Sequence, residues 1–372
     1  MEKPRRILFL DMMRMVALFM MIQGHTLYAF IEEEMRDGGT VFFSIWRSLR
    51  GFTAPFFLFI TGAVFMFLLL KNHTEDKINP RIKIALRRVL TLFFWAYFLN
   101  FNFDIFRYGL LDGYLIQLYR VDVLHVIGTG LCLMLLTYSL YSSRKVLFLP
   151  FLIILFVLPM YLNWMVTGVD FSEDLPNFLR PYINGTNVDT MFPLVPWLTY
   201  IMGGAILGVF IFTKQRKEGY EKTLWIYLLL TGSVFYLISM VGDSFERYYF
   251  GESFFWTKSP NLVFYRMGCV IIFGGLMALF ALRINTLPKL LRQMSQNTLW
   301  LYISHLLIIY SVGEPLIYTI YGEHHRFGIV GALLIVMIMF ALMVAQTKFI
   351  VWKNKKGGYG SLLRFRNYIE RE

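Results

Sequence analysis

The chain of 372 residues is too apolar for a soluble protein: 57% of its residues are hydrophobic, only 16% are charged, and the mean hydropathy is +0.55. Soluble domains carry about 25% charged residues, so the composition predicts an all-α, polytopic bundle of membrane-spanning helices. The net charge of +12 does not indicate a nucleic-acid partner, because the basic residues concentrate in the segments between apolar stretches. Cys132 and Cys269 both lie in apolar stretches, so the sequence suggests neither a disulfide framework nor a thiolate metal site.

Hydropathy predicts about ten membrane-spanning helices. Their expected ranges are 7–30, 52–70, 86–103, 121–142, 146–164, 191–213, 223–241, 260–282, 297–315 and 327–350. Ten spans place both termini on one side, and most Lys and Arg residues fall in the segments that share this side. The positive-inside rule therefore predicts cytoplasmic termini. We expect a single transmembrane domain at 1–352, a basic cytoplasmic tail at 353–372, and a multi-pass location in the cell (inner or plasma) membrane.

The first expected span carries Asp11, Arg14, Gln23 and His25 among apolar residues, and we interpret it as a retained helix rather than a signal peptide. An ionised group near the bilayer centre costs roughly 2.5–3.5 kcal/mol, so such groups usually have a function. Arg14 and His25 lie roughly 16 Å apart along a helix and about 20° apart around it, and Asp11 can pair with Arg14. The structural alternative is an Asp–Arg pair at one interface and a histidine that reaches the other.

Further polar residues occur in later spans. Asp122 and His125 lie three residues apart at the expected outer end of the fourth span, and Arg266 lies about two turns into the eighth. His305 lies near the middle of the ninth span with Tyr302 beside it. For His305 the alternative to a functional role is a single structural hydrogen bond to a neighbouring helix.

Small residues in two spans predict close helix packing. Gly62 lies in the second span, and the sixth contains Gly203, Gly204, Ala205 and Gly208. Such residues let helix backbones approach within a membrane, where packing replaces the hydrophobic driving force.

Several function classes have no motif in this chain. There is no Walker-type glycine loop, HExxH, CxxC pair or GxSxG. The adjacent His324 and His325 are interpreted as part of a solvated outer loop, so no metal site is predicted.

Arg14, ten intervening residues and His25, preceded by Leu10-Asp11, resemble the first helix of the transmembrane acyltransferase superfamily. This group includes the acyltransferase-3 proteins and the heparan-alpha-glucosaminide N-acetyltransferase-like proteins. Three further stretches fit in the same order, so the resemblance covers most of the chain: RGFTAPFFLFITG at 50–62, FPLVPWLTYIMGGAILG at 192–208 and LWLYISHLLI at 299–308.

One departure leaves the choice between the two branches open. Acyltransferase-3 members commonly carry an Arg-x-x-Arg near the cytoplasmic start of the third span. Here the basic residues at that place have another spacing, as Arg81, Lys83, Arg87 and Arg88.

The resemblance implies an enzyme that moves an acyl group, usually acetyl, from cytosolic acyl-CoA to a hydroxyl or amine of a sugar in an envelope glycan, lipid-linked sugar or polysaccharide. It implies His25 as the general base with Asp11 and Arg14 in support, and acetyl-CoA as a donor substrate rather than a tightly bound cofactor. An imidazole that titrates near neutral pH suits proton abstraction. Direct transfer and an acyl-histidine intermediate both remain open.

The donor and the acceptor are expected at different residues. A basic cytoplasmic face attracts the phosphates of coenzyme A, and the donor-binding candidates are Arg81, Lys83, Arg87 and Arg88. The candidates that line the acceptor's cavity are His305, Tyr302, Arg50, Asp122, His125 and Arg266.

A transporter or flippase is the alternative function. Intramembrane Asp, Arg and His residues equally suit proton relays or substrate binding. The sequence has no internal repeat and no matched pair of interrupted helices, which many secondary transporters show. Dependence on acyl-CoA separates the two functions, and the oligomeric state is left open.

Overall fold

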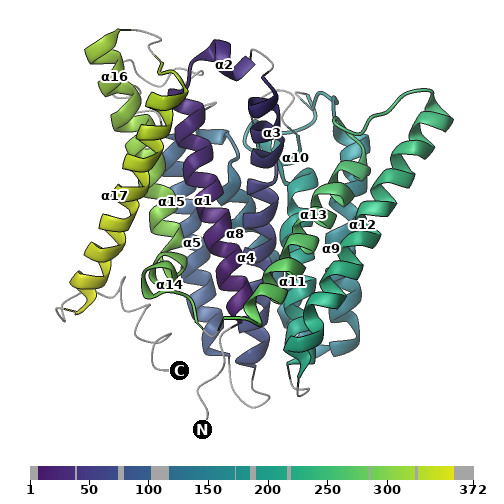
Figure 1. The fold of residues 1–372 in the computed structure, drawn as a ribbon. Coiled ribbons are helices and arrows are strands. Elements are labelled where there is room, and N and C mark those ends of the chain that lie inside the picture. The colour runs from purple at the N-terminus through teal and green to yellow at the C-terminus, as the bar shows by residue number, and fades with distance from the viewer. Residues whose placement is uncertain are drawn as a thin grey trace. The chain divides into compact units, whose positions relative to one another are not determined.

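The computed structural model describes residues 7–37, 40–73, 79–101, 117–171, 173–184, 190–215, 219–284, 286–322 and 326–355. In these residues the regular structure is helical (Figure 1), and the β-type pairing is one isolated bridge between Ile31 and Phe327. The prediction of a polytopic all-α membrane protein is confirmed. The pair His324 and His325 and most of the predicted tail lie outside the described residues.

Nine helical stretches in the described part of the chain are long and apolar enough to cross a membrane. They are Leu8–Phe30, Phe43–Lys71, Val123–Ser143, Lys145–Val166, Leu194–Lys214, Tyr220–Phe250, Pro260–Ala281, Thr298–Tyr321 and Ile329–Asn354. The expected third span corresponds to α5 (Pro80–Asn100), whose first half contains four basic residues, so α5 is not among the nine. The side of the membrane on which the termini lie stays a prediction.

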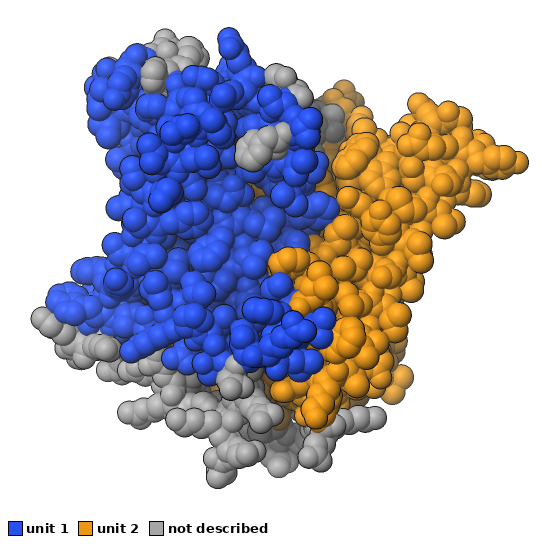
Figure 2. Space-filling model, viewed as in Figure 1, with its two compact units in different colours: residues 1–57, 277–372 blue, residues 58–276 orange. Residues whose placement is uncertain are grey.

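The helices fall into two compact units, coloured separately in Figure 2. Unit 1 comprises residues 1–57 and 277–372, and unit 2 comprises residues 58–276. The helices of unit 1 are α1 (Leu8–Phe30), α2 (Glu33–Asp37), α3 (Val41–Arg50), α14 (Lys289–Gln296), α15 (Thr298–Leu306), the π-helix η1 (Leu307–Gly313), α16 (Glu314–Tyr321) and α17 (Ile329–Lys355). Those of unit 2 are α5, α8 (Val123–Ser143), α9 (Lys145–Val166), α10 (Arg180–Ile183), α11 (Leu194–Lys214), α12 (Tyr220–Phe250) and most of α13 (Pro260–Ala281). The helix α4 (Thr53–Lys71) and the last turn of α13 cross the boundary between the units.

The helix α1 is the centre of unit 1. It packs against α17, α15, α14 and α3, and its buried residues are spread around its circumference, as expected for a helix enclosed by others. Its end is tied to the segment before α17, since Phe327 donates its backbone N–H to Phe30 over 2.8 Å and Glu32 donates to Phe327 over 3.1 Å. Helix α17 then runs back beside α1 (Figure 1).

Glycines set the close packing of helices in unit 2. A Cβ atom at Gly62 of α4 would lie 1.9 Å from the carbonyl oxygen of Ile201, and one at Gly204 of α11 would lie 1.8 Å from that of Phe59. Backbone therefore meets backbone where these helices cross. The predicted packing role of these small residues is confirmed.

A buried carboxylate holds the turn between α12 and α13. Glu246 is 5% exposed and accepts hydrogen bonds from the backbone N–H of Phe254 at 3.1 Å, the Nδ2 of Asn261 at 2.7 Å and the hydroxyl of Ser259. Because neutral donors satisfy this carboxylate, we assign it a structural role.

Candidate active site

The last turns of α1 carry the histidine expected to be catalytic. His25 lies five residues before the end of α1 and is half-buried. Its Nδ1 atom lies 3.2 Å from the hydroxyl oxygen of Tyr310 on η1. No hydrogen bond of its Nε2 atom occurs among the described residues, so this nitrogen is free to meet a substrate.

A second histidine faces the first. The ring centroids of His25 and His305 lie 5.5 Å apart. His305 is fully buried, and its Nδ1 donates to the carbonyl oxygen of Leu301, 3.0 Å away in the preceding turn of the same helix. That bond places the proton on Nδ1, so Nε2 carries a lone pair, and it has no partner in the described residues.

The ring of Tyr302 completes this side of the site. It lies 5.5 Å from the ring of His305 and stacks on Phe57 at 6.2 Å. The structure thus brings His25, His305 and Tyr302 together in unit 1, as expected for residues of one site.

The π-helix explains how Tyr310 reaches His25. In a regular α-helix, residues five positions apart point about 140° away from each other. The i→i+5 hydrogen bonds of Leu307–Gly313 widen the turn, so His305 and Tyr310 both contact His25. Gly313 keeps this segment near α1, since a Cβ atom there would lie 2.9 Å from the Phe30 ring. Hydrophobic periodicity in the sequence does not reveal a π-turn, so the sequence does not predict that Tyr310 contacts His25.

Arg50 reaches the same turn of α1 from the end of α3. Its guanidinium carbon lies 4.0 Å from the centre of the Tyr28 ring and 5.5 Å from that of Trp46. Its aliphatic stem runs along Gly24, where a Cβ atom would lie 3.7 Å away. Trp46 is held in turn by a 2.9 Å hydrogen bond from its Nε1 to Gln23. Tyr28, Trp46 and Gln23 carried no motif that assigned them to the site.

The expected Asp11–Arg14 ion pair is present, with a distance of 3.2 Å. It lies near the start of α1, roughly 16 Å along the helix from His25. The pair is therefore placed to act on a different part of a substrate from the imidazole, or to stabilise the beginning of the helix.

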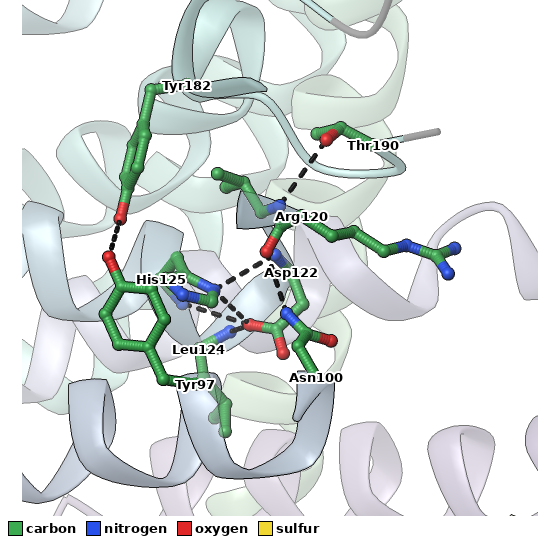
Figure 3. Close-up of polar contacts among 9 residues, drawn as sticks. Tyr97, Asn100, Arg120, Asp122, Leu124, His125, Tyr182 and Thr190 are labelled. Atoms are coloured by element: carbon green, nitrogen blue, oxygen red, sulfur yellow. Dashed lines mark hydrogen bonds and ion pairs between the residues drawn. The ribbon is translucent and has the colours of Figure 1, made fainter. Parts of the chain in front are cut away.

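Asp122 and His125 form a separate polar cluster in unit 2 (Figure 3). Asp122 caps α8, accepting from the backbone N–H groups of Leu124 at 2.8 Å and His125 at 3.1 Å. The buried His125 ring is close to the rings of Tyr97 and Tyr182, with centroid distances of 4.7 and 6.0 Å. The hydroxyl groups of these tyrosines lie 3.2 Å apart.

Burial determines the protonation state of Tyr182 in this cluster. Burial, followed by the hydrogen bond with Tyr97, raises the pKa of Tyr182, so its phenol stays neutral at physiological pH. The Nε2 atom of His125 is buried and has no partner among the described residues. A capping box explains the three-residue spacing of Asp122 and His125. In it, the side chain of each residue accepts a hydrogen bond from the backbone N–H of the other.

The remaining candidates also lie in unit 2. Arg266 is on α13, with its guanidinium carbon 5.9 Å from the centre of the Trp197 ring. The four donor-binding candidates occupy the first turns of α5, which Asn79 caps through a 3.0 Å bond to the backbone N–H of Arg81. They share partial or full exposure: Arg81, Lys83, Arg87 and Arg88.

The arrangement in unit 1 can carry out proton transfer. An imidazole with one nitrogen held by a hydroxyl and the other free is the geometry of a general base or nucleophile. The described residues contain no group of three or more His, Cys, Asp and Glu side chains that could hold a metal ion.

A comparison with protein families matches residues 6–241 to a model described as heparan-alpha-glucosaminide N-acetyltransferase, catalytic. The matched range contains Arg14, His25 and Arg50, whereas His305 and Tyr310 lie beyond it. None of the curated proteins and none of the solved structures matches the chain. The match covers more than half of the chain and agrees with the resemblance carried by the first helix. The chain therefore belongs to the heparan-alpha-glucosaminide N-acetyltransferase-like family, and it is a multi-pass membrane acetyltransferase.

Proposed function

We propose that this enzyme transfers an acetyl group from cytosolic acetyl-CoA to a hydroxyl or amine of a glycan or lipid-linked sugar, and that His25 is the residue that reacts. The observation that carries this proposal is the state of the two ring nitrogens. Tyr310 holds Nδ1, Nε2 has no hydrogen-bond partner in the described residues, and the ring of His305 lies 5.5 Å from that of His25.

The position of the proton on the imidazole ring supports His25 as the base. When Nδ1–H donates to the hydroxyl oxygen of Tyr310, Nε2 carries the lone pair. This nitrogen can remove the proton from the acceptor's O–H or N–H as the oxygen or nitrogen attacks the thioester carbonyl. The C–S bond then breaks, and the coenzyme A thiolate leaves and takes up a proton. In the alternative order, Nε2 first takes the acetyl group itself and then passes it to the acceptor.

His305 supplies the second polar position. Its bare Nε2 is buried, and an unpartnered buried acceptor costs about 1–3 kcal/mol. A hydroxyl or amine of the acceptor would satisfy it. We infer that His305 binds a polar hydrogen of the acceptor and orients it towards His25.

The positive charge beside the site suits the developing oxyanion. Arg50 lies against the turn of α1 that carries Gly24 and His25, and a guanidinium can stabilise negative charge on the carbonyl oxygen in the transition state. Arg50 is held by the rings of Tyr28 and Trp46 rather than by a carboxylate, so its charge is not neutralised by them.

The donor is assigned to the basic residues at the start of α5. Coenzyme A carries phosphates, and Arg81, Lys83, Arg87 and Arg88 form an exposed or half-exposed group that would attract them. Their place also agrees with cytoplasmic termini in a cell membrane under the positive-inside rule.

A thermal-unfolding titration with acetyl-CoA tests the proposal. The protein in detergent should be stabilised saturably, by about 2.7 kcal/mol at a hundredfold excess over the dissociation constant. Arg87→Gln with Arg88→Gln should weaken this shift. The matched control, Lys222→Gln with Lys289→Gln, removes the same charge elsewhere and should leave the shift unchanged.

Activity is the second readout. His25→Ala should abolish transfer of the radiolabelled acetyl group from acetyl-CoA to membrane glycans, while the unfolding temperature without ligand stays the same. Label retained on the wild-type protein after acid quench, and absent from His25→Ala, would indicate the acetyl-histidine route. Normal turnover by His25→Ala would overturn the assignment, and the absence of any shift at millimolar acetyl-CoA would favour a transporter.

A further inference from the structure

We propose a second ligand site in unit 2, where Arg266 of α13 and Trp197 and Tyr200 of α11 bind the phosphate of an anionic phosphate ester. This inference does not depend on the acetyl-transfer proposal. It arises from an arginine within a membrane-spanning helix that has no carboxylate partner in the described part of the chain.

Arg266 differs from Arg14 and Arg247, which have carboxylate partners. Arg14 pairs with Asp11 at 3.2 Å and Arg247 pairs with Asp243 at 3.0 Å. Arg266 has no such pair among the described residues, and its guanidinium carbon instead lies 5.9 Å from the centre of the Trp197 ring. An uncompensated charge in a membrane-spanning segment is costly and indicates a functional site.

Tyr200 provides a second, independent observation. Its side chain is 1% exposed, and the proton of its hydroxyl has no acceptor among the described residues. The Arg266 guanidinium acts on this hydroxyl both electrostatically and as a side-chain hydrogen-bond donor to its oxygen. A ligand oxygen held between Tyr200 and Arg266 would accept hydrogen bonds from both the hydroxyl and the guanidinium.

The N-terminus of α11 contributes the positive end of a helix dipole to this site. Val195 has non-helical backbone angles, φ −95° and ψ 114°, so the regular helix starts at Pro196 and Trp197. The first N–H groups of a helix have no intrahelical partner, and with the helix dipole they favour anions. Trp197 lies in this first turn and Tyr200 one turn further.

The depth of the site limits the kind of ligand. Helices α11 and α13 run in the same direction because α12 returns between them. Arg266 lies six residues after the start of α13, roughly 9 Å along the axis, and a long arginine side chain can extend from there towards the interface, where the phosphates of lipids and of sugar phosphates lie. Arginine forms two parallel hydrogen bonds to a phosphate, and its other face stacks on an aromatic ring.

A binding experiment in lipid nanodiscs separates the two sources of phosphate. In discs of phosphatidylcholine, glucose 1-phosphate is titrated and the unfolding temperature is recorded. In a second arm, discs with increasing phosphatidylglycerol are used without soluble ligand. A saturable increase in the first arm indicates a soluble phosphate ester, and an increase confined to the second arm indicates an anionic lipid.

Variants decide whether the effect belongs to this site. Arg266→Gln should raise the apparent dissociation constant about tenfold or more, as expected for the loss of charge-assisted hydrogen bonds, and Arg266→Lys should give a smaller increase. Arg247→Gln is the matched control, because it removes an arginine that already has a carboxylate partner, and its affinity should equal that of the wild type.

Tyr200→Phe distinguishes a binding role from a structural one. Without ligand, loss of the hydroxyl removes only its contact with Arg266 and should change the unfolding temperature little, whereas binding should weaken. The proposal is overturned if no phosphate ester stabilises the protein in either arm, or if Arg266→Gln responds as strongly as the wild type. It is also overturned if Tyr200→Phe lowers the stability of the free protein and leaves the affinity unchanged.

Discussion

The hydroxyl oxygen of Tyr310 lies 3.2 Å from Nδ1 of His25, across 285 positions of the chain. The contact joins the last turns of α1 to the π-helix between α15 and α16. A hydrogen bond to one nitrogen of an imidazole determines the tautomer and the direction of the other, so Tyr310 controls how Nε2 of His25 is presented.

Tyr310→Phe should lower kcat about tenfold with a small change in KM, because it removes the hydroxyl and keeps the ring. A hydrogen bond of this kind contributes roughly 0.5–1.5 kcal/mol, and its loss lets His25 rotate and change tautomer. Steady-state kinetics with acetyl-CoA would measure the effect. Tyr318→Phe, at an exposed position of α16, is the control, and equal kcat values for the two variants would contradict the role of Tyr310.

His305→Leu should leave the protein as stable as the wild type or make it more stable, and should lower activity about a hundredfold. The substitution removes a buried Nε2 that has no partner in the described residues, which offsets the loss of the Nδ1 bond to Leu301, so a large structural penalty is not expected. Unfolding temperature and turnover are measured on the same preparation. Full activity in a stable variant would show that His305 only packs against His25.

Gly62→Ala should destabilise unit 2 by about 1–3 kcal/mol or more, because the new methyl group would meet the carbonyl oxygen of Ile201 at 1.9 Å. The crossing of α4 and α11 would have to widen. Gly328→Ala is a suitable control, since the nearest atom to its added methyl group is 4.0 Å away. An unfolding temperature equal to that of the control would mean that the two backbones are not in contact.

Asp122→Asn and Asp122→Ala separate the helix cap from a role in acceptor binding. Asparagine caps a helix about as well as aspartate, whereas alanine costs roughly 1 kcal/mol. Thermal unfolding should therefore show a loss for Asp122→Ala only. If Asp122→Asn keeps full acetyltransferase activity, the carboxylate serves α8 alone, and a selective increase in KM for the acceptor would support the predicted binding role.

The class of the protein and one half of the candidate site follow from the amino-acid sequence. Composition and hydropathy predicted the helical membrane bundle, because a bilayer requires long apolar segments with internally satisfied backbones. The spacing from Asp11 through Arg14 to His25 lies within one helix, where periodicity translates directly into geometry. Gly62 and Gly204 were also recognised, since the need for small residues at crossings is visible in composition alone.

The tertiary structure decided which distant residues meet that helix. Tyr310 contacts His25 because a π-turn changes the angle between residues 305 and 310, and no periodicity in the sequence marks such a turn. The lack of a partner for Nε2 in His305, and the contact of the Tyr200 hydroxyl with Arg266, depend on what surrounds these groups from other helices. Local sequence determines where each helix begins and ends, whereas packing between helices determines the partners of a buried polar atom.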